Sequence, residues 1–187
     1  YFTLSYVQPD EYQFSHDSVF LARRVFEMVQ ASGQNYDRVL DLCAGCGVIG
    51  IDFLVHLQNV GMKPPQKIDF LEVQSVYHKF FAQNIAQVSN VKAFEYMTLN
   101  YGQVLEKPDL NSQYDLILCN PPYFHKEMGM RSNSEFKNRC RFFIDSDFEN
   151  LMKSLAYLLK STGTAYVLLK DLERNGICLE KQLRVFS

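Results

Sequence analysis

The chain lacks both a long apolar run and a cysteine framework. None of its apolar stretches approaches the roughly eighteen residues of a membrane-spanning helix, and no charged-then-apolar leader opens the sequence. The five cysteines are an odd number at irregular spacing, which is typical of reduced thiols rather than of a disulfide scaffold. These absences lead us to expect a cytoplasmic protein.

Metal-site and strongly basic patterns are also missing. Cys43 and Cys46 form a C-x-x-C pair, but no second pair and no nearby histidine pair completes a zinc site, so we expect no bound metal. The formal net charge of −2 excludes a globally basic surface, and any contact with nucleic acid must therefore be local. No internal repeat or low-complexity tract is found.

The composition that remains is that of an ordinary globular domain. Hydrophobic residues make up 47% of the chain and charged residues 21%, and both fractions are close to soluble averages. A length of 187 residues is enough for one full hydrophobic core and short for two. We expect a single domain over residues 1–187.

Apolar spacing predicts helices that alternate with strands. Helices are predicted at residues 17–31, 48–60, 75–89 and 147–159. Strands are predicted at residues 38–42, 67–71, 91–96, 114–119 and 164–169, with 182–186 as one more candidate. Gly163 is expected just past the end of the last helix. This alternation predicts a doubly wound α/β fold, in which helices cover both faces of a mostly parallel sheet.

A glycine-rich loop follows the first predicted strand. Residues 41–50 read Asp-Leu-Cys-Ala-Gly-Cys-Gly-Val-Ile-Gly, which places a G-x-G-x-x-G between a strand and a helix. The glycines let the backbone turn tightly against a ligand, and Glu72 at the end of the next strand can bind ribose hydroxyls. The pattern favours a nucleoside cofactor, either a dinucleotide or S-adenosylmethionine. The alternative is a tight turn that binds no ligand.

Asp41 distinguishes these two cofactors. A pyrophosphate beside this carboxylate would be repelled, whereas the cationic sulfonium of S-adenosylmethionine would not. Asp41 therefore favours the methyl donor. No acid follows the third predicted strand, so we expect Met97 to cover the adenine ring and Thr98 or a backbone group to supply a polar contact. Packing in the core explains Met97 equally well.

A rigid turn, Asn120-Pro121-Pro122-Tyr123, follows the strand predicted at 114–119. It stands at the carboxyl end of a central strand, where open α/β sheets bind ligands. The Asn120 oxygen and the Pro121 carbonyl can each accept an N–H from a planar, amide-like or aniline-like nitrogen, which turns the nitrogen lone pair toward a methyl donor. Tyr123 can stack on the planar group. The alternative is a turn that only ends the strand.

The order of these motifs resembles that of class I N-methyltransferases with an N-P-P-[YF] signature. The resemblance rests on Asp-Leu-Cys-Ala-Gly-Cys-Gly, Leu-Glu-Val-Gln and Asn-Pro-Pro-Tyr-Phe, and it covers about residues 41–169. The group includes glutamine N5-methyltransferases of release factors and adenine N6-methyltransferases of DNA and of RNA. The resemblance implies a Rossmann-like, seven-stranded-type sheet and S-adenosylmethionine as cofactor.

The opening of the chain narrows this resemblance. Residues 8–22 are similar to the opening of the bacterial tRNA adenine-37 N6-methyltransferases, and Phe124 is also usual in that group. The segment begins close to residue 1, so we expect no release-factor-binding domain before it. The resemblance implies methyl transfer to N6 of an adenine in RNA, with tRNA as partner. Glutamine or DNA adenine methylation, and less so a nucleotide-binding dehydrogenase or an inactive cofactor-binding module, remain alternatives.

The same resemblance implies roles for individual residues. Residues 1–31 would form a lid and helix over a catalytic core of residues 32–187, and Asn120, Pro121 and Tyr123 would be catalytic. The cofactor would contact Phe14, Ser15, Asp17, Asp41, Cys43, Ala44, Gly45, Gly47, Glu72, Val73, Gln74 and Asn120. The target base would contact Pro122, Tyr123 and Phe124. Helix entry and an N-cap explain Phe14 and Asp17 equally well.

Basic residues follow the signature in a stretch that we predict to be a loop. They are Lys126, Arg131, Lys137, Arg139 and Arg141, and aromatic residues lie among them. We expect Arg139 and Arg141 to contact RNA phosphates, a solvated loop being the alternative. Residues 171–175 are short for the next helix, and the chain stops where the last strands of the resembled family continue, so we expect a truncated sheet.

Overall fold

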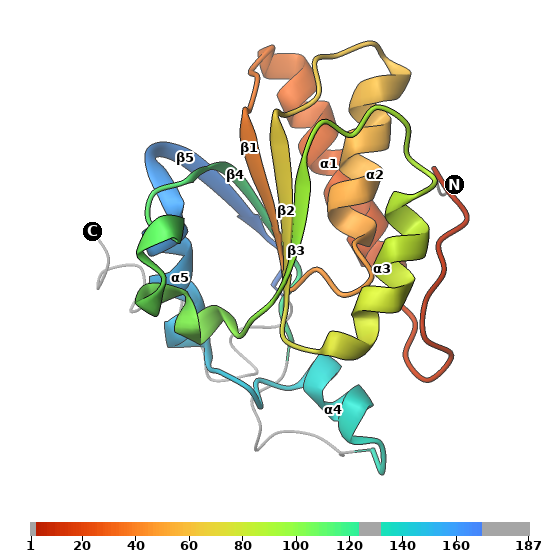
Figure 1. The fold of residues 1–187 in the computed structure, drawn as a ribbon, viewed down its shortest axis with the longest axis vertical. Coiled ribbons are helices and arrows are strands. Elements are labelled where there is room, and N and C mark those ends of the chain that lie inside the picture. The colour runs from red at the N-terminus through yellow and green to blue at the C-terminus, as the bar shows by residue number, and fades with distance from the viewer. Residues whose placement is uncertain (1–2, 124–131, 170–187) are drawn as a thin grey trace.

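The computed structural model describes residues 3–123 and 132–169 (Figure 1). Its helices and strands are α1 (His16–Ser32), β1 (Arg38–Leu42), α2 (Val48–Asn59), β2 (Lys67–Glu72), α3 (His78–Ile85), β3 (Phe94–Thr98), β4 (Tyr114–Cys119), α4 (Glu135–Arg141), α5 (Phe148–Leu158) and β5 (Leu159–Val167). Short 3₁₀ turns lie at η1 (Ser75–Tyr77), η2 (Tyr101–Glu106) and η3 (Pro108–Leu110). The candidate strand at 182–186 lies outside the described residues.

The five described strands form one parallel sheet in the order β3-β2-β1-β4-β5. Leu42 at the end of β1 is paired with both Leu71 of β2 and Cys119 of β4, so the carboxyl ends of these three strands are level. Figure 1 shows α1, α2 and α3 on one face of the sheet and α5 on the other. The predicted doubly wound α/β fold is therefore confirmed.

Two hydrophobic cores follow from the alternation of side chains along the strands. Val39 of β1 and Phe70 of β2 pack beneath α1, α2 and α3, whereas Leu40 and Leu71 pack beneath α5 and η2. Asp41 belongs to the first set, so its carboxylate points toward α2 and bonds the Gly50 N–H. A charged group is thereby placed in an apolar layer directly behind the glycine loop.

The predicted bounds of the third strand were wrong by several residues. The prediction was 91–96, but β3 pairs with β2 from Phe94, opposite Ile68, to Thr98, opposite Glu72. The hydrogen bonds to β2 determine where β3 begins and ends. The apolar residues of a sequence do not by themselves show where such pairing starts. The helix predicted at 75–89 also differs, since it opens as the 3₁₀ turn η1 and α3 ends at Ile85.

The prediction for Gly163 was also wrong. α5 ends at Leu158 and β5 begins at the next residue, so Gly163 lies inside the strand. Pairing between β4 and β5 is irregular here, and a Cβ on Gly163 would lie 2.8 Å from the Tyr114 carbonyl oxygen. Gly163 therefore allows the backbones of β4 and β5 to approach closely, and it does not end a helix.

The stretch before residue 142 was predicted to be a loop, but residues 135–141 form α4. The Ser134 hydroxyl caps this helix by accepting the Lys137 N–H. Asn138 holds the preceding backbone, since its side chain bonds both the N–H and the carbonyl of Ser132. These side-chain to backbone bonds define α4, which at seven residues is too short to show an apolar period.

Gly50 is where α2 lies directly on the sheet. A Cβ there would meet Cε1 of Phe70 at 2.7 Å and Cβ of Asp41 at 3.1 Å. Gly50→Ala is therefore expected to lower the free energy of unfolding by about 2 kcal/mol, measured by denaturant unfolding. Gly33→Ala is the control, because a Cβ at Gly33 meets nothing within 4 Å. Its left-handed backbone alone predicts a loss of about 1 kcal/mol, and equal losses for the two variants would contradict the packing explanation.

Candidate active site

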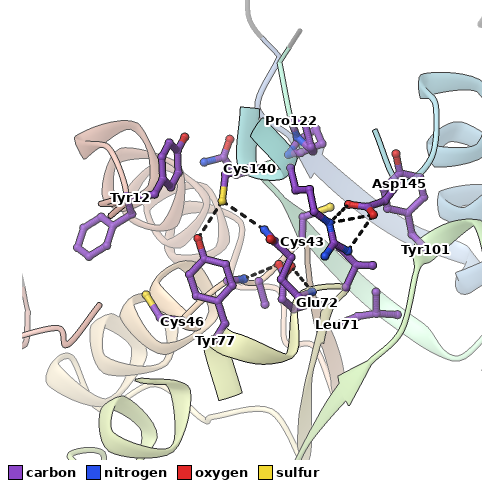
Figure 2. A pocket seen from close by; sticks show the side chains of 18 of the residues that line it. Tyr12, Cys43, Cys46, Leu71, Glu72, Tyr77, Tyr101, Pro122, Cys140 and Asp145 are labelled. Atoms are coloured by element: carbon purple, nitrogen blue, oxygen red, sulfur yellow. Dashed lines mark hydrogen bonds and ion pairs between the residues drawn. The ribbon is translucent and has the colours of Figure 1, made fainter. Parts of the chain in front are cut away.

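A cavity opens at the carboxyl ends of β1, β2 and β4 (Figure 2). Among the residues singled out from the sequence, those that line it are Phe14, Ser15, Cys43, Ala44, Gly45, Cys46, Glu72, Val73, Gln74, Asn120, Pro121, Pro122, Tyr123 and Arg139. Those that do not line it are Asp17, Asp41, Gly47, Met97, Thr98 and Arg141. Phe124 lies outside the described residues. The glycine loop and the N-P-P-Y turn, distant in sequence, therefore share one cavity.

The glycine loop owes its shape to left-handed backbone at Cys43, Gly45 and Gly47, with φ of 61°, 53° and 83°. Its Ala44 N–H donates to the Leu71 carbonyl of β2 at 3.0 Å, which ties the loop to the neighbouring strand. A Cβ on Gly47 would lie 2.7 Å from the Phe81 ring, so this glycine serves packing against α3. Gly45 is the glycine that faces the cavity.

Glu72 is the carboxylate on the glycine-loop side of the cavity. It is buried, with 7% of its surface exposed, and accepts the Gly45 N–H at 3.0 Å on one oxygen and the Gln74 N–H at 2.9 Å on the other. Burial raises the pKa of this carboxyl, against the lowering effect of those two hydrogen bonds. An ionised carboxylate accepts hydrogen bonds only, so the lone pairs that remain on Glu72 can accept ribose hydroxyls.

Asp41 lies behind the loop rather than in the cavity wall. It is fully buried and accepts the Gly50 N–H at 2.8 Å on one oxygen. Its other oxygen has no hydrogen-bond partner in the part of the chain that the structure describes. Burial raises the pKa of Asp41 to about 7. A buried carboxylate with an unsatisfied oxygen gains from a nearby positive charge, so the residue fits a cationic ligand on the far side of the loop.

The thiols of the C-x-x-C pair are held in the protonated form. Burial raises the pKa of Cys46 to about 12. The pKa of Cys43 is raised first by a hydrogen bond with Cys119 and then by burial. A thiolate is the form that binds metal, and these surroundings disfavour it. Within residues 3–123 and 132–169, no cluster of three or more histidine, cysteine or acidic side chains could hold an ion.

The chain after β3 contributes residues that the sequence did not single out. Leu99, Asn100 and Tyr101 line the cavity in place of Met97 and Thr98. β3 ends opposite Glu72, and the Leu99 N–H then bonds the Glu72 carbonyl at 3.1 Å, which turns the chain across the sheet edge. The carboxyl end of the strand lies two residues later than predicted, at Thr98 instead of residue 96, and the positions that line the cavity are later in the sequence for that reason.

In the N-P-P-Y turn, both the nitrogen and the oxygen of the Asn120 side-chain amide are hydrogen bonded. Asn120 Nδ2 donates to the Ser18 hydroxyl of α1 at 3.0 Å, and the Tyr123 hydroxyl donates to Asn120 Oδ1. The Tyr123 N–H bonds the Arg141 carbonyl at 3.1 Å, which ties the turn to the end of α4. Burial raises the pKa of Tyr123 to about 12, so its hydroxyl remains a donor at neutral pH.

α4 and the residues after it form the wall opposite the glycine loop. The Cys140 thiol lies within hydrogen-bonding distance of both Gln74 Nε2 (3.3 Å) and the Tyr77 hydroxyl (3.2 Å). Arg139 forms a two-pronged ion pair with Asp145, its Nε lying 3.0 Å from each carboxylate oxygen. In Figure 2 Tyr77 and Asp145 lie on opposite sides of Glu72. Arg139 is thus already bound by an acid, and a phosphate would have to compete with Asp145.

The N-terminal segment reaches the cavity because α3 holds it. Asn84 is fully buried, accepts the Val7 N–H at 2.7 Å, and donates to the carbonyls of both Val7 and Cys46. The segment runs beside α3 in Figure 1. This anchor brings Gln8, Pro9 and Tyr12 into the wall beside Phe14. A lone asparagine in a helix gave no sequence signal for that role.

The match to a known protein family spans both the glycine loop and the N-P-P-Y turn. Residues 8–140 match the family model described as the methyltransferase small domain. A tRNA1(Val) (adenine(37)-N6)-methyltransferase of Flavobacterium psychrophilum is 26% identical over 131 residues, covering 70% of this chain and 52% of that protein. A release factor glutamine methyltransferase of Clostridium acetobutylicum is 26% identical over 113 residues, covering 59% of this chain and 35% of that protein.

The solved structures include a similar fold. A SAM-dependent methyltransferase from Agrobacterium tumefaciens superposes with a TM-score of 0.57 at 11% identity, covering 83% of this chain and 45% of that one. This chain thus spans about half the length of these relatives or less. None of the helices in the described ranges has the length and apolar character that crossing a bilayer requires. Because the family model covers most of the sequence, the chain belongs to the methyltransferase small domain family, and its fold is that of S-adenosylmethionine-dependent methyltransferases.

Proposed function

We propose that this protein transfers the methyl group of S-adenosylmethionine to the exocyclic N6 of an adenine in RNA, with tRNA as the substrate class. One observation carries the proposal. The Asn120 amide, at the carboxyl end of β4, lines the same cavity as Glu72 and the glycine loop. An acceptor for the target N–H and a site suited to a nucleoside cofactor are therefore within reach of one another.

The cofactor fits the groups on the β1 and β2 side of the cavity. When bound, S-adenosylmethionine supplies an electrophilic methyl group on a positively charged sulfur. The Glu72 carboxylate can accept ribose hydroxyls, and Gly45 lets the backbone approach the cofactor without a side chain in between. The unsatisfied oxygen of Asp41 behind the loop favours a cation over a pyrophosphate.

Asn120 and Pro121 act on the amine. The N6 lone pair is delocalised into the adenine ring, so the nitrogen is a poor nucleophile. Acceptance of its two N–H groups by Asn120 Oδ1 and the Pro121 carbonyl turns the lone pair toward the methyl group. The new N–C bond forms as the S–C bond breaks, neutral S-adenosylhomocysteine leaves, and water takes one proton from the amine. No general base is required before transfer.

The N-terminal segment favours adenine over glutamine. Residues 8–22 carry the resemblance to the tRNA enzymes, and Gln8, Tyr12 and Phe14 of this segment line the cavity. The Flavobacterium relative bears the name of a tRNA adenine N6-methyltransferase. The Clostridium relative bears the name of a release factor glutamine methyltransferase, and the same turn could hold a glutamine amide. Glutamine methylation is therefore the second candidate.

Labelled S-adenosylmethionine separates these functions. The protein is incubated with total tRNA from a strain that lacks it, with release factors, or with DNA, and the modified product is identified by mass. N6-methyladenosine in tRNA is the expected product. A labelled glutamine in a release factor would favour the second candidate, glutamine methylation, over adenine methylation. Binding of S-adenosylhomocysteine without methyl transfer to any of these substrates would contradict the proposal.

Tyr123 provides a test of base stacking. Tyr123→Phe keeps the ring and loses only the hydroxyl that bonds Asn120, so transfer to tRNA is expected to stay within about threefold. Tyr123→Ala is expected to lower kcat/KM for tRNA about thirtyfold, because stacking of a base on an aromatic ring is lost. The control is Tyr157→Ala, on α5 outside the cavity. Equal losses for the phenylalanine and alanine variants would assign the effect to the hydroxyl instead.

A further inference from the structure

Ser18 meets the N-P-P-Y turn from the opposite end of the chain. It lies in the first turn of α1, is 5% exposed, and its backbone N–H bonds the Ser15 carbonyl at 3.1 Å. Its hydroxyl accepts the Asn120 Nδ2–H at 3.0 Å, across 102 residues of sequence. Both residues line the cavity, so the bond lies beside the proposed reacting atoms.

We propose that Ser18 is a positioning residue that fixes the plane and direction of the Asn120 amide for methyl transfer. The inference rests on the proposed function, because orientation of this amide matters only if Asn120 Oδ1 accepts an N–H of the substrate. Ser18 itself touches no reacting atom in this scheme. It acts through Asn120.

The need for such a residue follows from the chemistry of an asparagine side chain. Its oxygen and its nitrogen are nearly the same size, and rotation about the last bond exchanges an acceptor for a donor. A donor facing the substrate amine would meet its N–H groups instead of accepting one. With Nδ2 bonded to Ser18, Oδ1 is directed to the Tyr123 side of the cavity, where the Tyr123 hydroxyl also bonds it. The two contacts agree on one orientation.

The bond also joins the start of α1 to the turn that follows β4. α1 follows the segment held by Asn84, and the Phe14 N–H of that segment bonds the Gln8 side chain at 2.9 Å. Asn120 directly follows β4, the strand next to β1 in the sheet. An ordered N-terminal segment thus places Ser18, and Ser18 in turn orients Asn120.

Ser18→Ala is the test, because alanine favours the helix and removes only the hydroxyl. We expect kcat for transfer to tRNA to fall about tenfold, with KM for tRNA and the affinity for S-adenosylhomocysteine within about twofold of wild type. Ser18→Thr, which keeps a hydroxyl, is expected to restore kcat to within about threefold. The control is Val25→Ala, two turns further along the buried face of α1, which loosens helix packing without touching Asn120.

Other results would contradict either the role of Ser18 or the proposed function itself. An active wild-type enzyme with an equally active Ser18→Ala variant would overturn the role of Ser18. So would a kcat loss matched by Val25→Ala, a parallel loss of S-adenosylhomocysteine affinity, or a threonine variant as slow as alanine. Absence of transfer by the wild type to any acceptor would instead overturn the proposed function, and with it the role of Ser18.

Discussion

Replacement of Asn120 with alanine is expected to lower the rate of methyl transfer to tRNA by about a thousandfold, as for loss of a group that acts chiefly in the transition state. Its Oδ1 is the proposed acceptor for one N–H of the amine, and the remaining Pro121 carbonyl cannot align the lone pair alone. The affinity for S-adenosylhomocysteine, measured by calorimetry, should stay within about threefold, because Glu72 and the glycine loop are unchanged.

Asn120→Asp refines this prediction. Aspartate keeps an acceptor toward the amine but loses the Nδ2–H that bonds Ser18, so a rate between those of wild type and Asn120→Ala is expected. The control is Asn59→Ala at the exposed end of α2. Transfer by Asn120→Ala at a rate near wild type would contradict the role of this amide as acceptor, whatever the substrate proves to be.

The fold and the floor of the site were predictable because parallel strands impose them. Glu72 ends β2 and Asn120 directly follows β4, and a parallel sheet brings such strand ends to one edge. The glycine loop could be predicted for the same reason. Its G-x-G-x-x-G lies between a strand and a helix, and glycine readily adopts the left-handed backbone that this tight turn requires at Gly45 and Gly47.

The walls of the site were not predictable from local patterns. Ser18 and Asn84 act through single hydrogen bonds to residues far away in sequence, and such pairs leave no period or motif. α4 depends on a capping serine and on Asn138, and it was predicted to be a loop. Met97 was assigned a cofactor contact because the bounds of β3 were misjudged. The register with β2, which is a tertiary property, decides where that strand ends.

Asp41→Asn is expected to change how stability depends on pH. The folded pKa of Asp41 is raised to about 7, above its ordinary value near 3.8, so the folded state holds a proton that the unfolded state has lost. Stability therefore falls as pH rises from about 4 to about 7 and is level above that range. Asparagine still accepts the Gly50 N–H and does not ionise. Between pH 5 and pH 8 the wild type should lose about 3 kcal/mol more than the variant.

Denaturant unfolding at pH 5, 6, 7 and 8 measures this difference, and Asp115→Asn is the control, because the Asp115 carboxyl is ionised in both states over this range and its curve should run parallel to that of the wild type. Hydrogen bonds from Lys160 and the Arg38 N–H lower the pKa of Asp115 against the effect of burial, so its stabilisation is present at neutral pH and lost in acid. Asp115→Asn should thus destabilise the protein at pH 7 and match the wild type at low pH. Parallel pH curves for wild type and Asp41→Asn would show that Asp41 is ionised at little cost in the folded protein.

The same substitution separates stability from ligand binding. We expect the Asp41 carboxylate to stabilise a cationic sulfonium through a buried, low-dielectric layer, so Asp41→Asn should weaken the binding of S-adenosylmethionine about tenfold at pH 8. Neutral sulfur in S-adenosylhomocysteine lacks that attraction, and its affinity should change little. The wild-type preference for the cationic ligand should also grow as pH rises through about 7, because the carboxylate forms there. Equal weakening of both ligands would assign the effect of Asp41 to the loop geometry, because only a charge effect distinguishes the two sulfur states.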